Sequence, residues 1–201
     1  SAGIAFKQSN NGSVLNNTIT TYGAGSDKHG VYLRDSSTAN VTVANNTIRT
    51  DGSGRGNYGL ELLGNDHRVD GNSIWTNGTS LNAGIDLNDA RMIVTNNVIS
   101  THGSQDSNYG IYHTGSNHIV INNSITTDGT DYNDGIEFSG TNSSIINNTV
   151  RTYGSGVDNF GIGVFHAPDS NFSGNIILTN GTSSHGLVMR DAVATNARFI
   201  N

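Results

Sequence analysis

Apolar residues recur in this chain as short alternating segments that return at an interval of roughly 26 residues. In one repeat the segments are residues 98–101, 111–113 and 119–121, and Gly or Asn punctuates each of them. Segments this short with a period of two are typical of β-strands and too short for helices. Three such strands in every repeat predict that each repeat is one coil of a parallel β-helix.

Two sequence markers keep the same interval along the chain. The first is an Asn that lies two residues before a core aliphatic residue, and it recurs every 25 to 29 residues from Asn17 to Asn175. The second is a Gly followed by an aliphatic residue, and it recurs from Gly3 to Gly186. Two independent markers with one period predict a repeat architecture of about seven coils, all-β, over residues 1–201.

The marker Asn is predicted to form a ladder inside one corner of the coil. The residue before it is always Asn or Gly, the two types that best tolerate positive φ, which indicates a tight bend. Side-chain amides stacked about 4.8 Å apart can then hydrogen-bond along the axis. The predicted structural ladder consists of Asn17, Asn46, Asn72, Asn97, Asn123, Asn148 and Asn175.

Composition limits the possible partners. The formal net charge is -6 and only Lys7 and Lys28 supply lysine, so no basic patch is available to neutralise a nucleic-acid backbone. No apolar run approaches the length of a membrane span, and the absence of cysteine excludes disulfides. Only 33% of the residues are apolar, a low value that suits a core one residue column thick.

Both ends of the chain fall within a repeat. No amphipathic helix or polar segment is recognisable as a cap at either end, and exposed coil ends are adhesive edges. We therefore expect residues 1–201 to be a fragment of a longer chain, or to stack end to end with copies of themselves or with other subunits.

The recurring Asn-Asn-Thr-Ile and Tyr-Gly-Ile-Tyr phrases resemble the repeats of the pectin-lyase-like superfamily, over essentially the whole chain. The resemblance implies a right-handed parallel β-helix. Proteins with that fold include polysaccharide lyases, glycoside hydrolases, alginate epimerases, phage tailspikes and many surface proteins. The chain lacks the Asp-Pro-His-Glu stretch of the epimerases, the Asp-Asp pairing of polygalacturonases and a lyase-like Arg and calcium-carboxylate cluster. No catalytic residue can therefore be carried over.

The best candidate site lies on the outward face of the second strand of each coil. Carboxyl groups there should lie one or two rungs apart, about 5 to 10 Å, a separation that serves glycoside hydrolysis. Flanking tyrosines can stack on sugar rings, and an arginine lies nearby in sequence phase. The candidate carbohydrate-binding residues are Tyr32, Arg34, Glu61, Asp86, Tyr112 and Glu137.

Two other interpretations of this column stay open. In one, its residues are simply solvated, and their negative charges discourage lateral association of sheets. In the other, the face is catalytic, which predicts a groove walled by the variable loops and a strongly shifted pKa for at least one of Glu61, Asp86 and Glu137. His113 falls in an inward column and is expected to be a core residue.

The sequence predicts no metal site and no cofactor. Asp128, Asp131 and Asp134 share one loop and allow a Ca²⁺ interpretation, but no calcium-binding motif is present and turn-forming Asp is favoured. The histidines do not show metal-ligand spacings.

We expect an extracellular or cell-surface β-solenoid that acts as a structural or adhesive module and contacts a polysaccharide or cell-surface glycan. The first alternative is a carbohydrate-active enzyme, a polysaccharide lyase, hydrolase or epimerase, that uses the outward face of the second strand. The second alternative is a self-assembling filament or sheath subunit.

Overall fold

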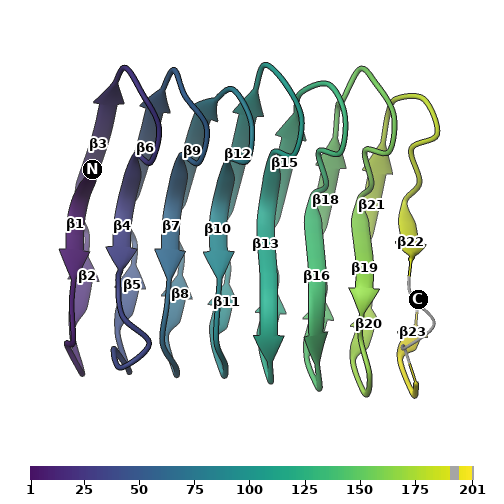
Figure 1. Cartoon of the computed structure of the whole chain (residues 1–201). Coiled ribbons are helices and arrows are strands. Elements are labelled where there is room, and N and C mark those ends of the chain that lie inside the picture. Colours follow the sequence, from purple (N-terminus) through teal and green to yellow (C-terminus); the bar gives the residue numbers. More distant parts are fainter. Residues whose placement is uncertain (191–194, 201) are drawn as a thin grey trace.

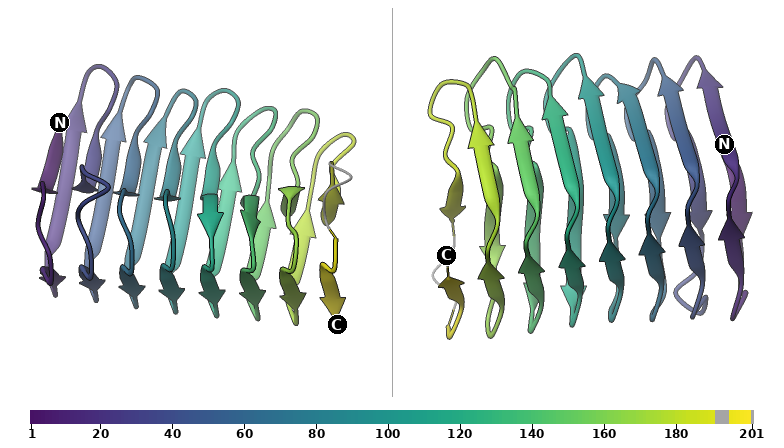
Figure 2. Two further views of the ribbon diagram at one scale, coloured as in Figure 1. Left: turned by 60° about the horizontal axis from the view of Figure 1, so that its bottom comes forward. Right: turned by 180° about the vertical axis from the view of Figure 1, so that it is seen from behind.

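The computed structural model of the chain describes residues 1–190 and 195–200, and its coils stack side by side along one axis (Figure 1). Each coil contributes one strand to each of three parallel sheets, and the described residues contain no helix. The N-terminus lies in the coil at one end of the stack, and the C-terminal strands lie at the other end (Figures 1 and 2). The predicted parallel β-helix is confirmed.

Three sheets, here named A, B and C, make up the walls of the coil. Sheet A consists of β1 (Ala2–Phe6), β4 (His29–Leu33), β7 (Tyr58–Leu62), β10 (Ala83–Leu87), β13 (Tyr109–Ser116), β16 (Ile136–Thr141), β19 (Ile162–His166) and β22 (Leu187–Met189). Sheet B consists of β2 (Ser13–Leu15), β5 (Thr42–Ala44), β8 (Arg68–Asp70), β11 (Ile93–Thr95), β14 (Ile119–Ile121), β17 (Ser144–Ile146), β20 (Asn171–Ser173) and β23 (Arg198–Ile200). Sheet C consists of β3 (Thr18–Gly23), β6 (Thr47–Gly52), β9 (Ser73–Gly78), β12 (Val98–Gly103), β15 (Ser124–Asp128), β18 (Thr149–Thr152) and β21 (Ile176–Thr179).

The number of rungs differs between the sheets. Sheets A and B have 8 strands each and sheet C has 7, whereas the sequence predicts about seven coils. The difference arises because the Asn marker opens only the sheet C strands, and β1 and β2 precede the first of them. The Gly marker, which lies in or just before the sheet A strands, occurs once for each of the eight.

Aliphatic columns fill the interior. Ile48, Ile74 and Ile99 are paired in register along sheet C and are at most 2% exposed. Ile85 and Ile111 are paired along sheet A and are completely buried. Each such side chain contributes about 1.5–3 kcal/mol of transfer free energy, so the stack is held by repetition of a thin core.

The marker Gly allows sheets A and C to approach closely. A Cβ at Gly84 would overlap the side chain of Ile99 and would lie 2.7 Å from the carbonyl oxygen of Gly110. At Gly186 in the last coil, the same atom would meet only Ile177, at an ordinary 3.7 Å. Close packing inside the stack therefore explains why glycine recurs at this position.

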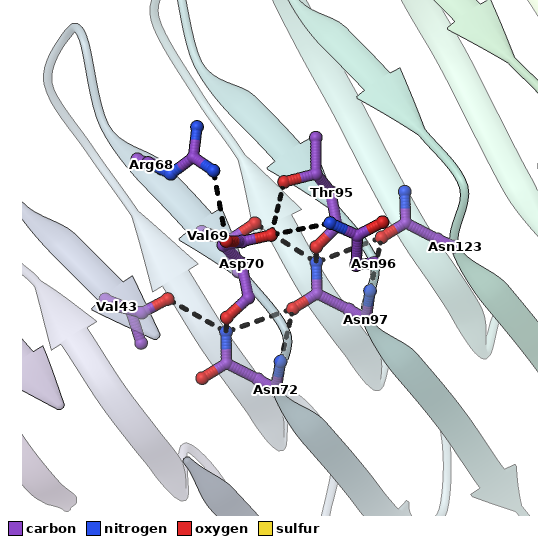
Figure 3. A network of polar contacts seen from close by, with 9 residues as sticks. All are labelled: Val43, Arg68, Val69, Asp70, Asn72, Thr95, Asn96, Asn97 and Asn123. Atoms are coloured by element: carbon purple, nitrogen blue, oxygen red, sulfur yellow. Dashed lines mark hydrogen bonds and ion pairs between the residues drawn. The ribbon is translucent and has the colours of Figure 1, made fainter. Parts of the chain in front are cut away.

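The predicted asparagine ladder is present (Figure 3). Asn97 is 1% exposed and donates to the carbonyl oxygens of Val69 (3.2 Å) and Thr95 (2.9 Å) and to Oδ1 of Asn123 (2.9 Å). Its own Oδ1 accepts from the backbone N–H and the side-chain amide of Asn72, at 2.9 and 3.0 Å. The preceding residue, Asn96, has a φ of 58°, as the bend requires.

A second asparagine ladder lines the bend between sheets C and A and was not predicted. Asn108 donates to Oδ1 of Asn133 from its backbone (3.0 Å) and its side chain (2.8 Å), and Asn133 repeats both bonds to Asn159. Each of these residues lies two positions before a marker Gly, so the phrase Asn-x-Gly was a readable signal. The two ladders thus run along two bends of the coil, one between sheets B and C and the other between sheets C and A.

Candidate functional site

The outward column of sheet A has the register that the sequence predicts. Tyr32 pairs with Glu61, Glu61 with Asp86, Asp86 with Tyr112, and Tyr112 with Glu137. Parallel pairing brings these side chains to adjacent rungs about 4.8 Å apart. The fold therefore gathers five of the six predicted residues into one line.

The sixth predicted residue, Arg34, lies on the same face. It lies two positions after Tyr32, just beyond the end of β4, and its guanidinium carbon is 5.4 Å from the Tyr32 ring centroid. Both side chains line the same hollow as Glu61. A cation above a tyrosine ring is favourable and holds the phenol in place.

A second outward column runs three residues before the first. Gly30 and Val31 both face the interior, because a Cβ at Gly30 would meet Ile48 in the core and Val31 is completely buried. Two successive inward residues bring His29 and Tyr32 to the same outer side, where their rings stack at 4.8 Å. The second column contains His29, Tyr58, Ala83 and Tyr109 in register.

Two hollows lie between these columns. The first has a volume of about 560 Å³ and is lined by His29, Tyr32 and Glu61 among others, with Asp27 from a loop. The second has a volume of about 240 Å³ and is lined by Asp86, Tyr109, Tyr112 and Glu137 among others, with Leu81 from a loop. Tyr58 borders both hollows. Together they form the sheet A groove, the term used below.

The carboxyl groups of the groove are largely shielded from water. Asp86 is 8% exposed and the Glu61 side chain is 18% exposed. Burial raises the pKa of Glu61 to about 7, and the neighbouring Asp27 carboxylate adds to the shift. Burial also raises the pKa of Asp86 to about 7, with a further contribution from Glu61. This shielding does not fit the interpretation of the face as a fully solvated surface.

Glu137, which lines the second hollow, and the nearby Asp134 have pKa values shifted in the same direction. Burial raises the pKa of Glu137, and a hydrogen bond from Tyr109 partly offsets this effect. Asp134 is 3% exposed, accepts a hydrogen bond from the Phe160 N–H (2.9 Å), and has its pKa raised to about 8 by burial. The pKa values of Glu61, Asp86, Asp134 and Glu137 are thus all raised, chiefly by burial.

Sequence reasoning missed Tyr58 and Tyr109 as members of the groove. Their shared signal is the position directly before the marker Gly, where aromatic residues recur. Burial raises the pKa of Tyr58 to about 12 and also raises that of Tyr109, so both phenols keep their protons and can donate hydrogen bonds. The groove therefore offers aromatic faces, hydroxyl donors and carboxyl groups.

Two histidines of sheet A, His29 and His113, stack on aromatic rings. His29 stacks on Tyr58 (5.4 Å) as well as on Tyr32, and its Nδ1 lies 3.3 Å from Glu61 Oε2. Burial lowers the pKa of His29 to about 4. His113 is completely buried and stacks on Phe138 at 4.3 Å, which confirms that it is a core residue.

The loop acids considered for Ca²⁺ have separate partners. Asp131 accepts the Val157 N–H (2.6 Å), while Asp128 lies 2.7 Å from a ring nitrogen of His102. Within the described ranges 1–190 and 195–200, no group of three or more His, Cys, Asp or Glu residues is placed to hold a metal ion.

Comparisons with known proteins show the fold. No protein-family model matches the chain, and no curated protein matches it. A structure of a point mutant of the periplasmic alginate epimerase AlgG matches with a TM-score of 0.63 and 14% identity, covering 100% of this chain and 47% of the epimerase. A second AlgG structure matches with a TM-score of 0.56 and 13% identity, covering 94% of this chain and 48% of the epimerase. The chain thus spans about half the length of these structures.

A surface protein and adhesin of Streptococcus pneumoniae, PfbA, also matches, with a TM-score of 0.34 and 14% identity, covering 98% of this chain and 68% of PfbA. The stacked coils and the epimerase matches define the chain as a parallel β-helix repeat protein. In the part of the chain that the structure describes, no helix is long and apolar enough to cross a membrane.

Proposed function

We propose that this chain is an extracytoplasmic β-solenoid module that binds a polysaccharide lengthwise in the sheet A groove. One observation carries the proposal: tyrosine rings and carboxyl groups shielded from water line two adjoining hollows that follow the solenoid axis. A chain of sugar residues presents the same regular repeat of apolar ring faces and hydroxyl groups. A groove along the rungs therefore matches a linear polymer better than a small compact ligand.

The chemistry of the groove supports a sugar ligand. Tyr32, Tyr58 and Tyr112 offer ring faces for stacking, the usual contact between proteins and the apolar face of a pyranose. With a pKa of about 7, Glu61 and Asp86 can each donate and accept hydrogen bonds at neutral pH. Such mixed donors and acceptors suit hydroxyl groups.

The extracytoplasmic location rests on the kind of partner and on the fold. Polysaccharides are chiefly found at and beyond the cell surface, and the solved structures with this fold include proteins described as periplasmic and as a surface adhesin. A structural or adhesive role needs only binding, which the groove supplies without a catalytic step.

Isothermal titration against a panel of soluble polysaccharides, including alginate, polygalacturonate and a neutral glucan, tests the proposal. Tyr112→Ala removes a ring from the groove and should weaken binding by about 5–30-fold, equivalent to roughly 1–2 kcal/mol. Tyr153→Ala is the matched control, because Tyr153 is 54% exposed and follows β18 of sheet C. Equal effects of the two substitutions, or no binding to any member of the panel, would reject the groove as the site.

A carbohydrate-active enzyme is the second candidate, and one observation favours it. Glu61 and Asp86 are in register on adjacent rungs, and both have a pKa near 7. A carboxyl group with a raised pKa can act as a general acid at neutral pH, and a second carboxylate can serve as base or nucleophile. Release of shortened or modified chains, abolished separately by Glu61→Gln and Asp86→Asn, would establish this candidate in place of a binding module.

A further inference from the structure

A hydrogen-bonded chain of three side chains crosses the outward face of sheet C, away from the groove. Ser100 and His102 lie two residues apart on β12, and Asp128 ends the neighbouring strand β15, in register with His102. Ser100 Oγ lies 2.8 Å from His102 Nε2, and His102 Nδ1 lies 2.7 Å from Asp128 Oδ2. The serine and the carboxylate therefore occupy opposite ring nitrogens of one imidazole.

The hydrogen-bonding capacities of the groups set the direction of this chain. An ionised carboxylate can only accept, so the proton on the near nitrogen of His102 must be on Nδ1. In the neutral imidazole Nε2 is then an acceptor, and the Ser100 hydroxyl must donate to it. A hydroxyl that donates to a histidine held by a carboxylate is the arrangement that activates a serine nucleophile.

The immediate surroundings form a shelf beside Ser100. Trp75 is in register with Ser100 on the preceding strand, and Val98, which is 57% exposed, lies two residues before Ser100 on the same face. The centroid of the Trp75 ring lies 5.5 Å from that of the His102 ring. The guanidinium carbon of Arg49 lies over the Trp75 ring, 4.1 Å from its centroid. An apolar surface next to the Ser100 hydroxyl suits the acyl group of a substrate, and the Arg49 guanidinium lies over the Trp75 part of this surface.

The site is accessible to solvent. The side chains of His102 and Asp128 are 33% and 42% exposed. Their hydrogen bond raises the pKa of His102 above its ordinary value, with burial acting in the opposite direction. Water can therefore reach the imidazole, which an acyl-enzyme needs for its hydrolysis.

We propose that Ser100, His102 and Asp128 form a second site that hydrolyses carboxylic esters through an acyl-serine intermediate. Ser100 Oγ forms a bond to the ester carbonyl carbon while His102 Nε2 takes the hydroxyl proton. The bond to the alcohol oxygen breaks, and His102 returns the proton to that oxygen. Water then attacks the acyl-serine with His102 as base, and the carboxylic acid and free serine are released.

The stabilisation of negative charge on the carbonyl oxygen limits the substrate class. The backbone of β12 pairs on both sides, with β9 and with β15, so its N–H groups are used within the sheet. Side chains must then supply the donors, and the Thr126 hydroxyl is in register with Ser100 on the side opposite Trp75. A site without backbone donors lacks a contribution of about 10²–10³ in rate, so esters with good leaving groups are the expected substrates.

Covalent labelling with an alkyl fluorophosphonate, followed by peptide mass spectrometry, tests the assignment together with p-nitrophenyl acetate hydrolysis. We expect Ser100 to be labelled at least about 100-fold faster than Ser73, as general-base assistance provides. Ser73 is exposed on the same face of sheet C and is the matched control. Ser100→Ala should abolish ester hydrolysis, while Ser73→Ala should leave it unchanged.

His102→Gln and Asp128→Asn separate activation from simple exposure. Each should lower the labelling rate of Ser100 by at least about 10-fold, because each removes base assistance or the correct tautomer. In the unaltered chain the rate should rise with pH as His102 loses its proton. Labelling of Ser100 no faster than that of Ser73, or labelling insensitive to Asp128→Asn, would overturn the proposal.

Discussion

Replacement of Asn97 by Ala is the most informative test of how the solenoid is held together. The substitution removes three hydrogen bonds that the Asn97 side chain donates and two that it accepts, all in one corner of the coil (Figure 3). The Asn72 backbone N–H and the Val69 carbonyl oxygen, among others, lose a partner in a site that is 1% exposed.

The expected cost follows from these bonds. Each hydrogen bond contributes about 0.5–1.5 kcal/mol net, and a buried group left without a partner costs about 1–3 kcal/mol. Water admitted to the vacated corner offsets part of this loss. We therefore expect Asn97→Ala to lower the free energy of unfolding by about 3–5 kcal/mol.

Urea unfolding followed by circular dichroism measures this cost, with Asn17→Ala as the control. Asn17 is exposed at the first rung of the ladder and donates only to Leu15 and Asn46. Its replacement should cost about 1 kcal/mol or less. If the two variants unfold with free energies within about 0.5 kcal/mol of each other, the ladder does not stabilise the coil in the way argued here.

Three further predictions concern close packing and protonation. Gly84→Ala should lower the midpoint of thermal unfolding strongly while Gly186→Ala leaves it nearly unchanged, because only the former forces a Cβ into packed atoms. Burial raises the pKa of Asp86 to about 7, so the folded state retains a proton that the unfolded chain releases near pH 4. The free energy of unfolding should therefore fall as pH rises from about 4 to about 7, by on the order of 4 kcal/mol, and Asp86→Asn should remove this fall in urea titrations. Burial lowers the pKa of His113 well below its ordinary value, so below about pH 6.5 the unfolded chain takes up a proton that the folded chain does not, and the free energy of unfolding falls. Calorimetry at pH 5 should show that His113→Phe, whose ring can stack on Phe138, removes this loss.

The coil architecture was predictable because each of its determinants repeats. Three features return at one interval, and each has a local physical cause. They are an Asn or Gly with left-handed backbone before Asn97 and its equivalents, an inward aliphatic residue, and a marker Gly. The outward column from Tyr32 to Glu137 was predictable for the same reason, since parallel pairing transfers sequence phase directly into register.

The properties of the groove depend on departures from simple alternation. Gly30 and Val31 both face the core, which brings His29 to the outer side, and a strict period of two would not place it there. Burial of Asp86 depends on the combined bulk of its neighbours on adjacent rungs, which no single repeat encodes. Strict alternation therefore gave no reason to place Tyr58 and Tyr109 in the groove.

The contact between His102 and Asp128 illustrates the same difficulty. It joins residues one rung apart, in a column where the other coils carry different side chains. Periodicity identifies positions that repeat, whereas this chain of hydrogen bonds exists in one place only. Its recognition required the register of β12 with β15 and the orientation of the imidazole ring.

Carbodiimide labelling of carboxyl groups, with and without a saturating polysaccharide, tests the proposed binding in the sheet A groove most directly. Glu61 lines the groove, whereas Asp51 lies on sheet C with a side chain that is 39% exposed. The account predicts that the polysaccharide protects Glu61 from modification and leaves the modification of Asp51 unchanged. Equal protection of both residues, or protection of Asp51 alone, would contradict it.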